Sequence, residues 1–178
     1  MRFPELVSTE RLILRRWRLE DADALKVALD RNKDHLVPWI PWATGQDSEL
    51  SWVVEQLERM QGEFAQDRNW SWAITLADRP GVVGGCGLHD RIGVGGLEIG
   101  YWLDRDQLGR GLASEAASAL VELALADPAV DHVEMHVDER NHSSARIPMR
   151  LGFAAAERRP RTDRWGSEII MVIWRLRK

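Results

Sequence analysis

The sequence contains a single cysteine, Cys86, among 178 residues. One thiol cannot form an internal disulfide, so a disulfide-stabilised miniprotein is excluded and a reducing compartment fits best. Charge of one sign is not in excess either, because 24 lysines and arginines stand against 28 aspartates and glutamates. Nonspecific DNA binding is therefore not expected, since it requires an electropositive face that meets many phosphates.

Long apolar runs are also missing. No uncharged apolar stretch reaches the roughly 18 residues that a membrane helix needs, and residues 1–11 have no apolar core of signal-peptide length. We therefore expect a cytoplasmic protein that does not enter the membrane. Apolar residues make up 44% and charged residues 29%, as in ordinary globular proteins. No linker or repeat divides the chain, which predicts one domain over residues 1–178.

Strand and helix periodicities alternate along the chain. Period-two alternation predicts strands near residues 12–17, 70–76, 82–88, 97–103, 133–137, 153–157 and 169–173. Helical spacing predicts helices near residues 22–29, 50–64, 112–123 and 142–150. This order predicts an α/β (α+β) fold with a mixed, mostly antiparallel sheet flanked by helices.

The segment from Glu98 to Glu115 runs from a predicted strand through a glycine loop directly into a helix. Gly109 and Gly111 would let a phosphate approach the main chain, and the first helical turn adds free N–H donors. The segment is therefore a candidate anion-binding loop; the alternative is a plain strand–turn–helix junction. No Gly-Lys-Ser/Thr follows, and Ser114 stands where a dinucleotide fingerprint has its third glycine.

A second segment, Asn141 to Phe153, gives this loop its context. Together with Gln107–Glu115, it resembles the two acetyl-CoA-contacting motifs of the GNAT N-acetyltransferases. Two further segments, Ser8–Arg15 and Pro38–Trp42, resemble more narrowly the RimJ/RimL type, which acetylates the N-termini of bacterial ribosomal proteins. In element order the resemblance runs from residue 8 to residue 175, and it implies a GNAT-like fold.

The resemblance implies an enzyme that moves acetyl from acetyl-CoA, without a metal, to a primary amine. The acceptor would be the N-terminal α-amine of a ribosomal or other protein; a small-molecule amine, an antibiotic, an aminoacyl-tRNA, or a catalytically weak CoA-binding sensor are alternatives. Succinyl-CoA stays open as donor, and a homodimer is consistent with the family. The implied cofactor-binding residues are Tyr101, Trp102, Leu103, Leu108, Gly109, Arg110, Gly111, Leu112, Ala113, Asn141 and Ser144.

Two positions depart from the family pattern. Leu108 stands where the loop usually begins with Arg or Gln, and Gln107 lies one residue early. Because main-chain N–H groups of the loop would bind the phosphate, this change need not abolish phosphate binding. Pro148 occupies the position of the tyrosine that many members use to protonate the leaving thiolate. The two departures favour the sensor alternative.

Glu98 and Ser144 are the candidate catalytic residues. An α-amino group titrates near pH 8, so a carboxylate acting through water suffices as base. Glu98 lies on the strand that the resemblance places beside the pantetheine; alternatively it is a surface carboxylate. Ser144 is the nearest hydroxyl to the departing sulfur, or else it caps its helix. Main-chain N–H near Tyr101 or Trp102 would meet the oxyanion.

Other residues have a functional and a structural interpretation. Trp39 and Trp42 are candidates for the acceptor pocket, or else pack in the core or a dimer face. The alternating histidines and acids of residues 132–138 suggest a metal site, but positions four apart on a strand are about 13 Å apart, which favours a polar face. Cys86 between two glycines indicates buried packing. The arginine-rich run 157–164 predicts a solvated loop or a contact for CoA phosphate or an acidic substrate.

Overall fold

The computed structural model describes residues 3–40, 49–163 and 165–178. The strands in this part of the chain are β1 (Leu6–Ser8), β2 (Leu12–Arg16), β3 (Asn69–Leu76), β4 (Arg79–His89), β5 (Gly96–Leu103), β6 (His132–Asp138), β7 (Ala154–Thr162) and β8 (Glu168–Arg177). The helices are α1 (Ala22–Arg31), α2 (Lys33–Leu36), α3 (Leu50–Ala65), α4 (Leu112–Ala126) and α5 (His142–Arg150), with the 3-10 turns η1 (Leu19–Asp21) and η3 (Arg105–Gln107).

One sheet contains all these strands in the order β1-β2-β3-β4-β5-β6-β8-β7. Among the described strands, β5 and β6 form the one parallel pair, and every other neighbouring pair is antiparallel. The mixed, mostly antiparallel sheet predicted from the element order is therefore confirmed. The short strand β1 was not predicted, because three residues give too little alternation to detect.

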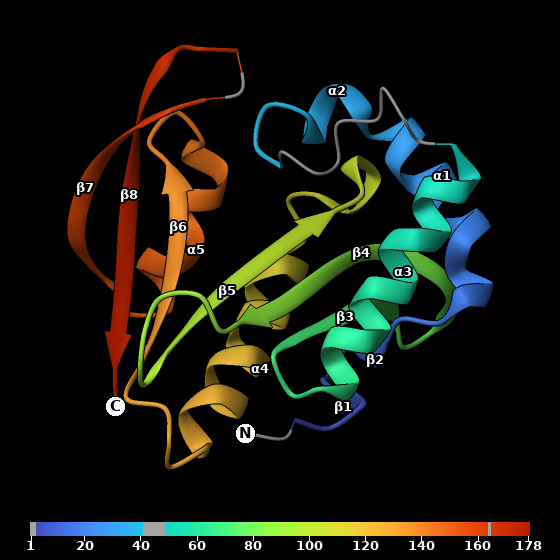
Figure 1. Ribbon diagram of the computed structural model, residues 1–178, viewed down its shortest axis with the longest axis horizontal. Coiled ribbons are helices and arrows are strands. Elements are labelled where there is room, and N and C mark those ends of the chain that lie inside the picture. Colours follow the sequence, from blue (N-terminus) through green and yellow to red (C-terminus); the bar gives the residue numbers. More distant parts are fainter. Residues whose placement is uncertain (1–2, 41–48, 164) are drawn as a thin grey trace.

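Helices cover both faces of the sheet (Figure 1). On one face, called here the α4 face, helices α4 and α5 enclose a core that includes Leu97, Ile99 and Leu120. On the other, called the α1 face, helices α1 and α3 pack on Trp17 and Trp102. Successive strand residues point to opposite faces, so the alternation along β5 sends Ile99 and Trp102 to different cores.

Glycine in β4 makes room for one of these aromatic side chains. A Cβ on Gly85 would lie 2.6 Å from Nε1 of Trp102. Because Gly85 and Trp102 are directly opposite in the register of β4 and β5, only a residue without a side chain fits there. The size of the Trp102 side chain on β5 thus explains why β4 has a glycine at position 85.

The parallel pair β5–β6 is the structural feature that positions the site. The two strands pair over Gly96–Glu98 and His132–Glu134 and then separate, as Figure 1 shows. Along β5, the Gly95 carbonyl accepts from His132 N at 3.2 Å, and backbone groups of alternate residues point the same way. This alternation directs the main-chain N–H of Tyr101 toward the gap between the strands.

Two predicted segments differ in the structure. The run 157–164 was expected to be a loop, but β7 continues through it to Thr162 because β8 supplies a hydrogen-bonding partner. All residues of β7 are nonetheless exposed, so the run is solvated. A short helix, α2, ends just before the connector at Pro38, and Trp42 lies outside the described residues. In the described ranges, no helix is long and apolar enough to cross a membrane.

Candidate active site

The loop between β5 and α4 carries a row of unpaired backbone donors. Gly109 and Gly111 have positive φ angles of 73° and 78°, and Gly111 is the N-terminal capping residue of α4. From Gly109 to Ser114, no backbone N–H has a hydrogen-bond acceptor among the described residues. A Cβ on Gly109 would meet no atom within 4 Å, so the loop faces open space. Adjacent donors at the positive end of a helix dipole can bind an anion such as a phosphate.

Arg11, just before β2, forms hydrogen bonds that hold this loop. Its Nη1 donates to the Arg110 carbonyl at 2.9 Å, while Nε and Nη2 both reach Oε2 of Glu115 at 2.7 Å. Glu115 also accepts from Thr9 Oγ1 at 2.6 Å and from Arg11 N at 2.8 Å. Burial disfavours the charged form of Glu115, but these donors outweigh it and lower its pKa. From the sequence, Ser8–Arg15 is identified only by its resemblance to the family, and the contact between Arg11 and Glu115 is not predicted.

A buried polar cluster fixes the other end of the loop. Asp104, which is fully buried at the end of β5, forms an ion pair with Arg31 and accepts from Asn32 Nδ2 at 3.1 Å. The amide oxygen of Asn32 in turn accepts from Arg105 N at 2.8 Å. These contacts connect the C-terminal end of α1 to the start of the loop between β5 and α4. No sequence pattern predicts this cluster, because Arg31 and Asn32 are more than 70 residues away from Asp104 in the sequence.

The predicted cofactor residues divide into side chains that face the loop surface and side chains that do not. Leu108 is 46% exposed, and the Arg110 side chain donates to the side-chain oxygen of Gln107. By contrast, Trp102, Leu103 and Leu112 are buried, Trp102 in the core of the α1 face, so only their main chain is available to a ligand. Ala113 is half-buried.

At the start of α5, the two residues predicted from the second motif have different contacts. Asn141 is the capping residue of α5, and its Oδ1 accepts from Ser144 N at 3.0 Å, which leaves the amide NH₂ available as a donor. The Ser144 hydroxyl does not cap the helix; it lies 2.9 Å from the hydroxyl of Tyr101. Burial raises the pKa of Tyr101 to about 12, against the opposing effect of the Ser144 hydrogen bond.

This pairing of hydroxyls was not predicted. The position usually taken by tyrosine is buried Pro148, but the sole tyrosine of the chain reaches the same helix from β5. With its pKa raised, Tyr101 stays protonated at neutral pH and can donate to Ser144. The signal in the sequence was the period-two alternation, which puts Tyr101 on the same face as Ile99 and α4.

Glu98 lies at the point where β5 and β6 begin to separate, on the α1 face. It is 9% exposed, and both carboxylate oxygens accept from Arg91, at 2.7 Å from Nε and 2.6 Å from Nη2. Burial disfavours its charged form, yet the hydrogen bonds and the charge of Arg91 lower the pKa of Glu98. It is therefore a buried, paired carboxylate and not one at a solvated edge.

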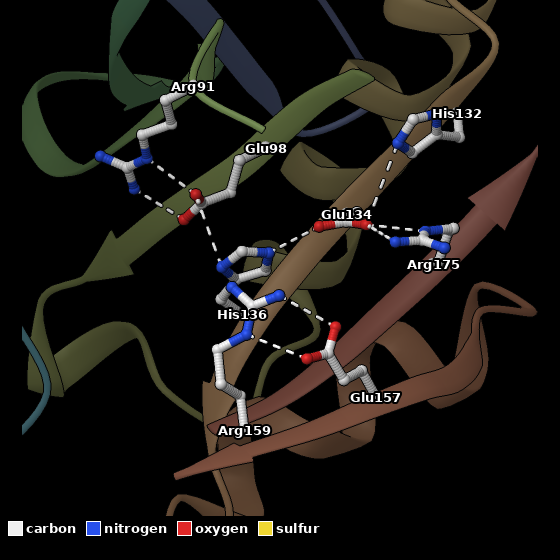
Figure 2. Close-up of polar contacts among 8 residues, drawn as sticks. All are labelled: Arg91, Glu98, His132, Glu134, His136, Glu157, Arg159 and Arg175. Atoms are coloured by element: carbon white, nitrogen blue, oxygen red, sulfur yellow. Dashed lines mark hydrogen bonds and ion pairs between the residues drawn. The ribbon is translucent and has the colours of Figure 1, made fainter. Parts of the chain in front are cut away.

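Figure 2 shows that the polar residues of β6 continue from Glu98 across the same face. His136 lies between Glu98 and Glu134, and Arg175 from β8 contacts Glu134. In the described part of the chain, no group of three or more His, Cys, Asp or Glu could hold a metal ion. The histidines and acids of β6 contact one another and Arg175, and so form a polar face on the strand.

Two further candidates remain. Trp39 follows α2 and is 36% exposed, so it is accessible to solvent. Cys86 is buried in the sheet, and burial raises the pKa of its thiol. A protonated, buried thiol is a poor nucleophile, which agrees with a packing role.

Comparison with known families agrees with this arrangement. Residues 11–154 match the family described as the acetyltransferase (GNAT) domain. The chain belongs to the GNAT acetyltransferase family, and the reaction of the family is acetyl transfer.

Individual relatives are more distant. The chain is similar to an N-acetyltransferase of Bacillus licheniformis named p20 and described as uncharacterised, with 28% identity over 158 residues, covering 84% of this chain and 82% of the relative. The structure of the present chain is similar to that of RimL, the ribosomal L7/L12 α-N-protein acetyltransferase in complex with coenzyme A. The TM-score is 0.88 at 16% identity, and the match covers 97% of this chain and 98% of RimL. The structure is also similar to MccE, the microcin C7 self-immunity acetyltransferase in complex with acetyl-CoA and AMP, with a TM-score of 0.87, 16% identity, and coverage of 96% and 94%.

Proposed function

We propose that the protein transfers acetyl from acetyl-CoA to the N-terminal α-amine of a protein, with a ribosomal protein as the first candidate. The single observation that carries the cofactor assignment is the row of unpaired N–H groups from Gly109 to Ser114 beside the gap between β5 and β6. The similarity to RimL supports the acceptor class.

The residues of the α4 face fit acetyl-CoA. The cradle from Gly109 to Ser114 would hold its pyrophosphate on backbone donors, and the free amide NH₂ of Asn141 would donate to its pantetheine arm. When bound, acetyl-CoA supplies a thioester that is already activated for acyl transfer. The enzyme then needs mainly to position a neutral amine against it.

Three groups of the chain would carry the chemistry. Glu98 would draw the amine to the gap and accept its proton through water. The main-chain N–H of Tyr101 would stabilise negative charge on the acyl oxygen. Ser144, itself hydrogen-bonded to protonated Tyr101, would donate to the departing sulfur. Trp39 and Trp42 stay candidates for the wall of the acceptor site.

A small-molecule amine is the second candidate acceptor, and the similarity to MccE favours it. Release of CoA thiol should be measured with a peptide that carries a free N-terminus, with the same peptide blocked at that position, and with a panel of small amines. We expect release only with the free peptide, together with a mass increase of one acetyl group at its N-terminus. Release with the small amines alone would replace the proposed acceptor, and no release with any amine would favour a CoA-binding sensor.

The proposal also covers the acyl donor, the cellular location and the oligomeric state of the protein. Parallel assays with succinyl-CoA test the donor, and we expect acetyl-CoA to be preferred. We propose a cytoplasmic location, which the single buried cysteine supports. A homodimer is a further prediction, which sedimentation analysis of the purified chain would test.

A further inference from the structure

A cluster of titratable side chains lies on the α1 face where β5 and β6 begin to separate (Figure 2). His136 on β6 is at its centre, with Nε2 2.7 Å from Oε2 of Glu134 and Nδ1 3.7 Å from Oε2 of Glu98. The distance to Glu134 is that of a hydrogen bond, whereas the distance to Glu98 is too long for one. One ring nitrogen is thus bonded, and the other faces a carboxylate without a hydrogen bond to it.

Both carboxylates beside the ring are held by arginines. Arg91 donates to both oxygens of Glu98, and Arg175 reaches Oε1 of Glu134 at 2.6 Å from Nε and 2.5 Å from Nη2. Burial disfavours the charged form of Glu134, but the bonds from His136 and Arg175 lower its pKa, in the same direction as that of Glu98. Neither carboxylate would retain a proton at neutral pH, so a proton that reaches Glu98 must move on.

The state of the imidazole follows from its partners. An ionised carboxylate only accepts hydrogen bonds, so Nε2 of His136 must donate to Glu134. A neutral imidazole carries one N–H and one lone pair, and the lone pair is therefore at Nδ1, on the side of Glu98. Imidazole is also the side chain that ordinarily exchanges a proton between pH 5 and 8.

The place of His136 in the sheet puts its side chain just beyond the last paired residues of β5 and β6. Glu134 is the last β6 residue paired with β5, and His136 is the next residue on the same face. On β5 the residue after Glu98 on that face is Gly100, which has no side chain. The His136 side chain is 22% exposed, so it is partly open to solvent.

We propose that His136 takes up, at Nδ1, the proton that the acceptor amine releases; Glu134 fixes the ring and Glu98 relays the proton and stabilises the charged imidazole. The amine N–H bond breaks, its electron pair stays on nitrogen, and an N–H bond forms at Nδ1, so the ring gains one positive charge until solvent removes the proton. This inference rests on the proposed function. It names the final proton acceptor of that same site.

His89 on β4 also lies beside Glu98, but burial and Arg91 lower its pKa to about 4, so it is a poor proton acceptor at neutral pH. The other charged groups around the ring are paired. Glu157 and Arg159 approach from β7 and pair with each other at 2.9 Å, and Arg91 and Arg175 are occupied by Glu98 and Glu134. His132 lies on the far side of Glu134, with Nε2 3.9 Å from its Oε1. His132 is therefore a matched control on the same strand and face.

The test compares His136→Gln with His132→Gln in assays of CoA thiol release from pH 6 to pH 9.5, with the peptide acceptor of the first assay. We expect His136→Gln to lower kcat about tenfold to a hundredfold at neutral pH, with a smaller loss at higher pH as the amine deprotonates unaided. The KM for acetyl-CoA should change little. His132→Gln should retain both the rate and the pH profile of the wild type.

A second pair of measurements keeps the inference testable if His136→Gln does not fold. Added imidazole should restore part of the activity of His136→Ala and should not change that of Ser144→Ala. In wild-type protein labelled at histidine nitrogens, NMR should assign the neutral proton of the His136 ring to Nε2. A His136 ring with its neutral proton on Nδ1 would overturn the inference.

The two proposals fail in different ways. If the wild type acetylates no amine, the proposed function is wrong. If the wild type acetylates the peptide while folded His136→Gln retains its kcat and pH profile, only the role of His136 is wrong.

Discussion

The two faces of the sheet meet at the same gap between β5 and β6, but they present different chemistry to it. On the α4 face, the loop from Gly109 to Ser114 presents main-chain N–H groups, while the predicted contact side chains of Trp102, Leu103 and Leu112 are buried. On the α1 face, the start of the gap is bordered by side chains: Glu98 is paired with Arg91, and His136 is bonded to Glu134.

The difference shows what each side tolerates. Main-chain donors depend on backbone conformation and on the contacts that hold it, so most side chains can change without loss, as Leu108 in place of the usual Arg or Gln illustrates. Side-chain chemistry depends on the particular group, and one substitution removes it. The variants below test this contrast, from the largest expected effect to the smallest.

Glu98→Gln should have the largest effect, because it removes the charged group that attracts the amine and relays its proton. We expect kcat to fall about a hundredfold at neutral pH. The folded pKa of Glu98 lies below its ordinary value, so the wild-type carboxylate stays ionised above that pKa and its contribution is lost only as the pH falls through it. Recovery of the variant at high pH therefore reports deprotonation of the amine. Glu157→Gln, which breaks an exposed pair with Arg159, is the control and should leave kcat unchanged.

Ser144→Ala tests whether the α4 face contributes any side-chain chemistry. A thiolate leaves readily by itself, so the loss of one hydroxyl should lower kcat about tenfold, with little change in the affinity for acetyl-CoA. The neighbouring Ser143→Ala is the control, because Ser143 is exposed and its hydroxyl has no described partner. Tyr101→Phe should produce a smaller loss than Ser144→Ala. A lower melting temperature with intact kcat would assign the Ser144 hydroxyl to structure alone.

Much of this arrangement could be predicted from sequence, because it depends on local patterns. The strand alternation places Tyr101 and Glu98 on opposite faces, and the glycine spacing identifies the cradle. The contacts between distant segments could not be predicted: Asp104 with Arg31 and Tyr101 with Ser144 are formed by the fold, which brings together residues that share no periodicity.

Gly111→Ala tests the backbone of the cradle. Alanine at a φ of 78° is strained by about 1 kcal/mol or more, so the loop should shift away from the conformation that aligns its donors. We expect the Kd for acetyl-CoA to rise about tenfold, or about 1.4 kcal/mol, in equilibrium binding. Gly166→Ala carries the same backbone cost, at a φ of 83° in the turn between β7 and β8. It should lower the melting temperature similarly and leave the Kd as it is; equal Kd values for both variants would remove this loop from the binding site.

Arg11→Lys should have the smallest effect, because it acts on the cradle through its support. Arg11 bonds the Arg110 carbonyl and Glu115 with a planar guanidinium, whereas an ammonium cannot hold both with the same geometry. We expect the Kd for acetyl-CoA to rise about threefold, or about 0.7 kcal/mol, with kcat unchanged. Arg16→Lys is the matched control, since Arg16 also bonds a carboxylate and a carbonyl, those of Glu5 and Gln61, away from the loop. If both variants weaken binding equally, the effect comes from general destabilisation. If only Arg11→Lys does, a side chain just before β2 sets the orientation of the main-chain donors, and the cradle depends indirectly on a side chain that does not itself touch the ligand.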